Sequence, residues 1–494
     1  MKGGNMRIKS VIVKLSIVFI LCSLVYPVKQ GICATVGNNQ REAVNETYEN
    51  LGPFIESLTQ IQQVYVDESK VKGKSLIYGA IRGMLMSLDP YSQFLDPQEY
   101  KELQSETTGN FGGLGIEIAI RNDILTVVAP IDKTPAYQAG IKPGDRIVKI
   151  NGESTKDITL LEAVRKLRGP KGTKVIITVS REGIKDFFDL TITRDIINII
   201  SVWKHIVDDN TGYIKIRNFA EKTAPDMEKA ILELKDKKIK AIIIDLRNNP
   251  GGLLSSAVDV SNYFLQEGTL IVYTEGRMKA QNMRFVANKK ENICDEPLVI
   301  LVNKGSASAS EIVTGAIKDN NRGVIIGSQT FGKGSVQTIY NLSDDSGIKI
   351  TTAYYYTPSG KLIHEKGITP DIVVEEKEPS EITWKLKYKE YFINFAKKYV
   401  KENPKTSIDS LQKIDDKILD DFIKTVHSSG FEISNESIDK DKQWVKRFLK
   451  VEIIRELKGE DTADVADLSE DPVVQRAIDV LKATEIMKKS GATK

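Results

Sequence analysis

Residues 304–312 read Lys304-Gly305-Ser306-Ala307-Ser308-Ala309-Ser310-Glu311-Ile312, and they follow a short apolar run at 297–302. The apolar run is typical of a buried strand, and the residues from Glu311 to Ile317 can begin a helix. A serine at such a strand-to-helix corner can expose its hydroxyl, while the helix N-terminus supplies free backbone N–H groups for a developing oxyanion. The stretch therefore has the setting of a nucleophile.

A second stretch supplies a candidate base for this serine. It reads Gln329-Thr330-Phe331-Gly332-Lys333-Gly334-Ser335-Val336-Gln337. The chain has three histidines, none of them in a recognisable motif: His205, His364 and His427. The glycines on either side of Lys333 let the backbone bring its amine close to another segment. A lysine acts as a base only when burial lowers its pKa from ~10.4 towards roughly 7–8.

Each stretch alone also has an ordinary structural interpretation. A run of small residues usually marks tight packing or a loop, and a lysine between glycines usually marks a surface turn. The two stretches together favour a serine nucleophile with a lysine base.

Both stretches carry a resemblance to a known family. Ser308 in GSASASE, Lys333 in TFGKG and Gln337 four positions later closely resemble the C-terminal processing peptidases, also called carboxyl-terminal or tail-specific proteases. The separation of 25 residues between Ser308 and Lys333 is also similar. The resemblance implies that Ser308 is the nucleophile, Lys333 the general base and Gln337 the group that orients the lysine. The Gln337 amide oxygen could accept a hydrogen bond from the amine and fix its rotamer without adding charge.

The residues alone do not choose among the three serines of the first stretch. The choice of Ser308 over Ser306 and Ser310 rests on the resemblance. We expect Ser310 to cap the following helix, with Glu311 in its first turn.

The region before these stretches predicts a βαβ layer. Residues 212–219 and 240–246 have the character of strands, and 224–237 that of the helix between them. The second strand runs into Asp245-Leu246-Arg247-Asn248-Asn249-Pro250-Gly251-Gly252-Leu253, followed by a helical pattern at 257–265. Ligands bind outside the carboxyl ends of such strands, so this glycine turn is expected at the active site.

The glycine turn does not match a nucleotide-binding loop, because GxxxxGK[ST] is absent and the spacing fits no dinucleotide motif. The family resemblance implies instead that the N–H groups of Gly252 and Ala309 form an oxyanion hole. Two such donors stabilise the tetrahedral intermediate of acyl transfer.

Residues 109–194 resemble a PDZ domain. Gly113, Leu114, Gly115 and Ile116 would form its carboxylate-binding loop and the start of the peptide-pairing strand. A GLG loop alone is weak evidence, but the run Ala139-Gly140-Ile141-Lys142-Pro143-Gly144-Asp145 makes the resemblance strong. A groove that only packs internally is the less favoured alternative.

The PDZ groove has two further expected parts. Ile150-Asn151-Gly152 predicts a hairpin turn, and 160–167 the helix that lines the groove. Arg168, at the end of this helix, is a candidate charge for coupling peptide occupancy to the protease. A cation that faces the helix dipole is an equally good interpretation.

The N-terminus has the order of a secretory signal. Basic residues precede an apolar run at 15–28, and cleavage after Ala34 is expected. The alternative is an uncleaved anchor at 11–28. Both place the protein outside the cytoplasm, in the periplasm or at the outer face of the cytoplasmic membrane. Once the signal is removed, Cys294 has no intramolecular disulfide partner, and no thiolate metal site is expected.

Two other parts have helical patterns. Residues 42–104 carry an apolar stripe that we expect to pack on its own domain, with a dimer contact as the alternative. Within them, 87–95 (Ser87-Leu88-Asp89-Pro90-Tyr91-Ser92-Gln93-Phe94-Leu95) resembles the stretch before the family's regulatory module and is assigned no chemistry. Beyond Glu375 the chain is rich in Lys, Glu and Asp, and its helices either assemble oligomers or pack on the core.

The predicted fold is therefore α+β and multidomain, as the length of 494 residues requires. Its parts are a signal or anchor (1–34), a helical region (41–105), a PDZ domain (109–194), a crotonase-like α/β protease core (195–375) on which 41–105 packs, and a helical extension (376–494). The core is expected to close with a strand at 348–356 and with turns between which His364 is a surface imidazole.

The predicted function is an exported serine endopeptidase that captures C-terminal tails and cleaves cell-envelope proteins through an acyl-enzyme. Its partners are substrates with exposed tails, and an accessory envelope protein is left open. The net charge of +3 gives no indication of nucleic acid, and no metal or cofactor is implied. The alternatives are a PDZ scaffold with an inert core and an acyl-transfer enzyme with a related core, which would not explain the tail-binding module.

Overall fold

The computed structural model describes residue 48 and residues 50–121, 123–131, 133–288, 293–375, 377–411 and 413–490. The predicted signal or anchor segment lies outside the described residues. The chain divides into two compact units, between Gly83 and Met84. No helix in the described ranges combines the length and apolar character needed to cross a bilayer.

The first unit is helical. It contains α2 (Leu51–Val64) and the short η1 (Glu68–Lys70), and α3 (Gly73–Met86) runs to its boundary. No residue of α2 is buried, and Ile55 of the predicted stripe is 59% exposed. Packing of this stripe on its own domain and the alternative dimer contact both stay predictions.

The second unit opens with an element that the helical pattern at 42–104 did not predict. The strand β1 (Gln93–Leu95) pairs antiparallel with β18 (Gly347–Tyr356) and buries Phe94. Pairing with a distant strand outweighs the local helical pattern. The following α4 (Pro97–Thr108) starts at a capping box in which the Asp96 carboxylate accepts from the Glu99 N–H at 2.9 Å.

The PDZ-like module is a six-stranded sheet with two helices. Its elements are β3 (Ile116–Arg121), β4 (Ile124–Pro130), α5 (Pro135–Gln138), β5 (Arg146–Ile150), β6 (Glu153–Ser154), α6 (Leu160–Leu167), β7 (Lys174–Ser180) and β8 (Phe188–Thr193). The predicted hairpin is confirmed, because Asn151 and Gly152 both have positive φ between β5 and β6. The strand β3 forms one edge of the sheet. Outside this sheet, β2 (Asn110–Gly113) pairs with β9 (Asp195–Asn198) where the chain enters and leaves the module.

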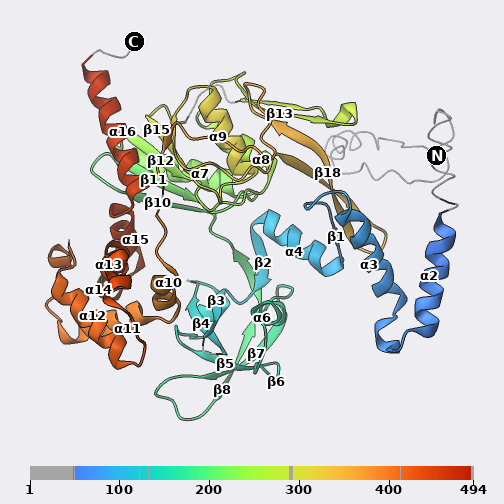
Figure 1. The fold of residues 1–494 in the computed structure, drawn as a ribbon, viewed down its shortest axis with the longest axis horizontal. Helices are drawn as coiled ribbons and strands as arrows, with labels where there is room; N and C mark the ends of the chain where they lie inside the picture. Colours follow the sequence, from blue (N-terminus) through green and yellow to red (C-terminus); the bar gives the residue numbers. More distant parts are fainter. Residues whose placement is uncertain are drawn as a thin grey trace, which may run out of the picture. The chain divides into compact units, whose positions relative to one another are not determined.

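The core is built on a second six-stranded sheet (Figure 1). In spatial order its strands are β10 (Val202–Ile206), β11 (Thr211–Ile216), β12 (Ala241–Asp245), β15 (Leu298–Val302), β16 (Val324–Gly327) and β19 (Ile372–Val373). All neighbours are parallel except β10 and β11. The predicted βαβ layer is confirmed by α7 (Thr223–Asp236), which connects β11 to β12.

Both faces of this sheet are buried, which explains the continuous apolar run in β15. Ile300 and its alternate neighbours pack with α7, α8 (Leu254–Asn262) and α9 (Ala309–Asp319). Val299 and Leu301 pack on the opposite face with α16 (Pro472–Lys489). A smaller sheet orders β1, β18, β13 (Leu270–Gly276) and β14 (Arg284–Val286), with β17 (Ser335–Asn341) also on β18.

The C-terminal helices form a core of their own before α16 reaches the sheet. They are α10 (Glu381–Tyr388), α11 (Tyr391–Glu402), α12 (Asp416–Ser428), α13 (Asn435–Lys440), α14 (Lys442–Lys458) and α15 (Glu460–Ser469). Phe392, Phe422 and Phe448 lie at the centre of this cluster. Packing of the extension on the protease core is thus observed for α16, and assembly through the extension stays a prediction.

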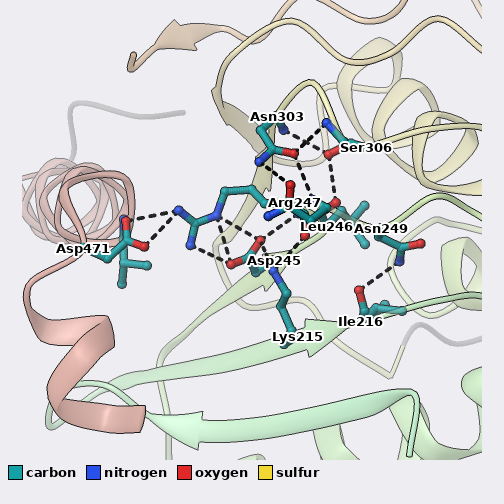
Figure 2. A network of polar contacts seen from close by, with 12 residues as sticks. Lys215, Ile216, Asp245, Leu246, Arg247, Asn249, Asn303, Ser306 and Asp471 are labelled. Carbon is teal, nitrogen blue, oxygen red and sulfur yellow. Dashed lines mark hydrogen bonds and ion pairs between the residues drawn. The ribbon is translucent and has the colours of Figure 1, made fainter. Parts of the chain in front are cut away.

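A buried ionic network fixes the turn at the end of β12 (Figure 2). Both Asp245 oxygens accept from Arg247, at 2.7 Å from Nη2, and Lys215 lies 3.2 Å from the same carboxylate. On its other side Arg247 contacts Asp471 at 2.9 Å. Asp471 also caps α16 by accepting from the Val473 N–H. The network therefore ties the turn after β12 to α16.

The electrostatics of Asp245 follow from this arrangement. Burial raises the pKa of this carboxyl, but the charges of Arg247 and Lys215 outweigh burial and hold the pKa well below its usual range. Asp245 is therefore ionised in the interior, and it compensates two cations that have little access to water.

We expect Asp245→Asn to lower the free energy of unfolding by about 3–5 kcal/mol, because Arg247 and Lys215 would lose their buried counter-charge. Urea denaturation followed by tryptophan fluorescence measures this loss. The matched control is Asp236→Asn at the exposed end of α7, for which a change within about 0.5 kcal/mol is expected. Equal stability of the two variants would contradict the role of the network.

Candidate functional site

Ser308 lies at the corner between β15 and α9. Its backbone has φ 54° and ψ −114°, a conformation that is strained for a residue with a side chain. A serine on a strained turn between a strand and a helix is the arrangement of a nucleophile elbow. The first N–H groups of α9 accordingly lie beside its hydroxyl.

Hydrogen bonding distinguishes the three serines that the sequence left equivalent. The Ser306 hydroxyl donates to the Leu246 carbonyl at 2.8 Å, and the Ser310 hydroxyl to the Asn249 carbonyl at 2.9 Å. The Ser308 hydroxyl has no hydrogen-bond partner among the described residues. The expected capping role of Ser310 is wrong, because α9 begins one residue before it and Ser308 occupies the cap position.

The glycine turn packs directly against this corner. A Cβ on Gly251 would lie 2.8 Å from the Ser308 Cβ and 2.9 Å from the Ala309 nitrogen. At Gly252, with φ 145°, a Cβ would lie 2.1 Å from the Phe219 carbonyl oxygen. Only glycine fits at these two positions, and the close approach places the turn's backbone beside Ser308.

Two N–H groups at this corner remain free for a ligand. Within the described chain, neither Gly252 nor Ala309 donates its N–H to an acceptor, although the flanking Gly251 N–H binds the Asn249 side chain and the Leu253 N–H binds Phe219. Asn249 also accepts from the Ala307 N–H at 3.0 Å, which holds the turn on the serine loop.

Glu311 joins the serine loop to the lysine loop. One of its oxygens accepts from the Thr330 hydroxyl at 2.6 Å and from the Gly332 N–H at 2.7 Å. The other accepts from the N–H groups of Ser308 and Lys333, both at 2.9 Å. Burial raises the pKa of this carboxyl, and the four hydrogen bonds oppose the rise. A single buried side chain thus fixes the backbone at both proposed catalytic positions.

Sequence reasoning missed this role and assigned Glu311 only to the first turn of a helix. The available signal was an acidic residue three positions after a candidate nucleophile, inside an otherwise apolar helix. That pattern predicts a buried carboxylate but does not name its partners in a distant loop.

The lysine loop packs against residues 363–367. A Cβ on Gly334 would lie 2.2 Å from the His364 nitrogen, so the glycine allows the close approach that the sequence suggested. The Lys333 side chain is half-buried, and burial lowers the pKa of its amine. The amine lies over the ring of Tyr91, 5.0 Å from the ring centre. No hydrogen bond joins it to the Ser308 hydroxyl among the described residues.

Gln337 lies on β17, and its amide donates to the Ser335 hydroxyl at 2.8 Å. No hydrogen bond between Gln337 and Lys333 is present in the described residues. The β17–β18 register shifts between Val336 and Gln337, so the strand does not keep the simple alternation that would place both side chains on one side.

His364 is not the surface imidazole that the sequence predicted. Its Nδ1 is buried without a hydrogen-bond partner in the described part of the chain, and its ring packs 4.9 Å from Tyr354 and 6.2 Å from Tyr91. The surface prediction failed because Gly332 and Gly334, on either side of Lys333, let the lysine loop pack closely on residues 363–367. His205 packs on Trp203 in β10, and His427 contacts the Ile433 carbonyl after α12.

The predicted peptide loop lies between β2 and β3. The N–H groups of Leu114 and Gly115 donate to no acceptor among the described residues, while the Leu114 carbonyl accepts from Ala136 at 2.9 Å. The loop is therefore fixed by its carbonyl groups and leaves donors for a carboxylate. Gly113 ends β2, and Ile116 opens β3, which lies at the edge of the sheet.

Arg168 follows the last residue of α6, and its guanidinium lies 4.4 Å from the centre of the Phe111 ring on β2. Its proposed coupling to the protease stays a prediction. No cluster of His, Cys, Asp and Glu in the described ranges could hold a metal ion.

Known proteins are similar in sequence to this chain over most of its length. The peptidase family S41 model matches residues 210–374, the PDZ domain model matches 126–181, and the model described as activating protease CtpB N-terminal domain matches 19–99. The photosystem II D1 C-terminal processing protease is a solved structure with 30% identity and a TM-score of 0.39, covering 65% of this chain and 92% of its own.

Two relatives carry the family assignment. The carboxy-terminal-processing protease of Bartonella bacilliformis is 43% identical over 396 residues, which cover 79% of this chain and 86% of that protein. The carboxy-terminal processing protease CtpA of Bacillus subtilis is 38% identical over 343 residues, covering 69% and 70%. The chain therefore belongs to the carboxy-terminal processing proteases of peptidase family S41.

Proposed function

We propose that this protein is an exported serine endopeptidase that captures protein C-terminal tails in its PDZ domain and cleaves a nearby peptide bond with Ser308 and Lys333. One observation carries the proposal: of the three neighbouring serines, Ser308 alone has a hydroxyl without a hydrogen-bond partner in the described part of the chain, and it lies at a helix start beside a glycine turn. The free N–H groups of Gly252 and Ala309 would receive the oxyanion.

Acylation begins when the neutral Lys333 amine takes the proton of the Ser308 hydroxyl. The oxygen attacks the scissile carbonyl carbon, and the carbonyl oxygen becomes an oxyanion held by the N–H groups of Gly252 and Ala309. The lysine ammonium then gives its proton to the leaving amine as the C–N bond breaks. The product is an ester between Ser308 and the N-terminal part of the substrate.

Deacylation repeats these steps with water. Lys333 takes a proton from water, the hydroxide adds to the ester carbonyl, and the ammonium returns the proton to the Ser308 oxygen as the acid leaves. For this cycle the amine must come within hydrogen-bond distance of the Ser308 hydroxyl. Gln337 would orient it once it arrives, after a rotamer change that frees its amide from Ser335.

Tail capture would use the edge of β3. An extended peptide can pair with this edge while its terminal carboxylate binds the N–H groups of Leu114 and Gly115. The N-terminal sequence order supports export to the cell envelope, so envelope proteins with exposed tails are the proposed substrates.

We expect Ser308→Ala and Lys333→Ala each to lower kcat by at least about 10⁴-fold, because each removes a group that the acyl-enzyme cycle requires. Cleavage of an unstructured protein with an apolar C-terminus measures the loss. A fluorescent peptide with the same C-terminus should bind both variants like the unchanged protein. Binding without cleavage by the unchanged protein would instead indicate a PDZ scaffold with an inert core.

The matched controls are Ser306→Ala and Ser310→Ala. Their hydroxyls bind backbone carbonyls, so these variants should lose some stability and keep measurable cleavage. Full cleavage activity in Ser308→Ala would refute the choice of nucleophile. So would a loss of cleavage that occurs only in Ser306→Ala or Ser310→Ala.

Glu311→Gln should reduce both activity and stability, because the amide carries two hydrogens and cannot accept all four donors. We expect a loss of about 1–3 kcal/mol in the free energy of unfolding and a fall of at least about 10-fold in kcat. Thr330→Val, which removes one of the four donors, should have an intermediate effect. The control is Glu267→Gln at an exposed position, and a similar result for Glu267 and Glu311 would exclude the bridging role.

The pH dependence of kcat/KM should report the lysine. The amine is a base only in its neutral form, which dominates above its pKa, and burial lowers that pKa. As the pH increases, kcat/KM should therefore rise with a midpoint below ~10.4, which is the pKa of an exposed lysine. A midpoint at or above that value would contradict a buried lysine base.

A further inference from the structure

We propose that Tyr91 is a positioning residue for Lys333: its ring face binds the protonated amine and sets how readily the lysine becomes a base. This inference rests on the proposed function of Lys333 and assigns chemistry to the 87–95 stretch, which the sequence left without any. The Tyr91 ring acts through the lysine amine that it contacts.

The contact has the geometry of a cation–π interaction. The Lys333 Nζ lies 5.0 Å from the Tyr91 ring centre, inside the limit of about 6 Å for this interaction. Among the described residues the amine has no hydrogen-bond acceptor and no carboxylate partner. The ring face is therefore its compensating contact in a half-buried setting.

A hydrogen-bonded turn fixes the ring in place. The Asp89 carboxylate accepts from the N–H groups of Tyr91 at 2.7 Å and Ser92 at 2.8 Å, and from the Ser92 hydroxyl at 2.7 Å. The Ser92 hydroxyl in turn accepts from the Thr351 N–H on β18 at 3.1 Å. Because β1 pairs with β18 directly after this turn, the position of Tyr91 is set by the sheet that also carries β17.

The surroundings of the Tyr91 side chain leave space for substitutions. A cavity of about 100 Å³ lies beside Tyr91, and the edge of His364 packs on the ring at an interplanar angle of 69°. A side chain of equal or smaller size at position 91 therefore meets no steric barrier. Substitutions there can test the ring face itself.

The ring and burial act in opposite directions on the lysine. Burial disfavours the ammonium form, whereas the negative face of an aromatic ring favours it. An attraction of cation–π strength corresponds to roughly half to one pKa unit. Removing the ring face should thus lower the pKa of Lys333 further, and the neutral base should appear at lower pH.

Other charged groups surround the lysine loop and must stay constant in the test. Burial and then the positive charge of Lys333 lower the pKa of Lys349 on β18. The remaining titratable groups nearby are Glu311 under the loop, Glu106 beside Lys349, and Asp89, Tyr354, His364 and Glu365 around the cavity. None of these is altered by a substitution at Tyr91, so differences among position-91 variants isolate the ring.

The test compares kcat/KM against pH for the unchanged protein, Tyr91→Phe and Tyr91→Leu. Phenylalanine keeps the ring face, so its midpoint should match that of the unchanged protein. Leucine removes the aromatic ring face, so the midpoint of the Tyr91→Leu profile should fall by roughly half to one pH unit. At a pH well below the midpoint, the fraction of Lys333 in the neutral form should then rise about 3–10-fold. Coinciding midpoints for all three proteins, or a fall in Tyr91→Phe equal to that in Tyr91→Leu, would overturn the proposal.

A second variant set protects the test against misfolding of Tyr91→Leu. Pentafluorophenylalanine at position 91 keeps the shape of the ring but reverses its electrostatic face, so its midpoint should fall like that of leucine. A midpoint equal to that of phenylalanine would overturn the proposal, because packing alone would then explain the contact.

The outcomes also separate this inference from the proposed function. Cleavage that survives in Lys333→Ala refutes the lysine base, and with it the reason to examine Tyr91. An inactive Lys333→Ala together with unchanged midpoints in the Tyr91 variants refutes only the positioning role.

Discussion

The carboxylate of Glu311 is the constraint on which the site depends. It accepts hydrogen bonds from the backbone of both Ser308 and Lys333, and from Thr330 and Gly332 between them. A buried charge is stable there because four donors surround it and because it lies in the first turn of a helix, where the dipole favours an anion. The strained conformation of Ser308 persists because this carboxylate and the glycine turn together leave the backbone no other position.

The core sheet brings these loops together. Its parallel strands end at one edge, so the turn after β12 and the serine loop after β15 meet there. The lysine loop follows β16, the parallel neighbour of β15 away from β12, and it contacts the serine loop through Glu311. The candidate site is consequently assembled at the ends of three neighbouring strands. The PDZ-like module has its own free N–H groups and a strand edge, in a different part of the chain.

Local patterns predicted what local forces determine. The apolar run at 297–302 became β15, and the groove helix at 160–167 has the predicted bounds, because burial and capping act within each segment. Long-range pairing was not visible in the same way: β1 is a strand only because it adds to β18. The candidate site shows the same division: the family motifs predict Ser308 and Lys333 from local sequence, whereas the bridging role of Glu311 depends on partners some twenty residues away.

The ion pair between Arg247 and Asp471 spans 224 positions of sequence. Translation proceeds from the N-terminus, so a growing chain contains Ser308, Lys333 and the glycine turn well before Asp471 leaves the ribosome. Until then Arg247 lacks the partner that joins its turn to the last helix. The join between this turn and α16 therefore forms only after α16 has been synthesised.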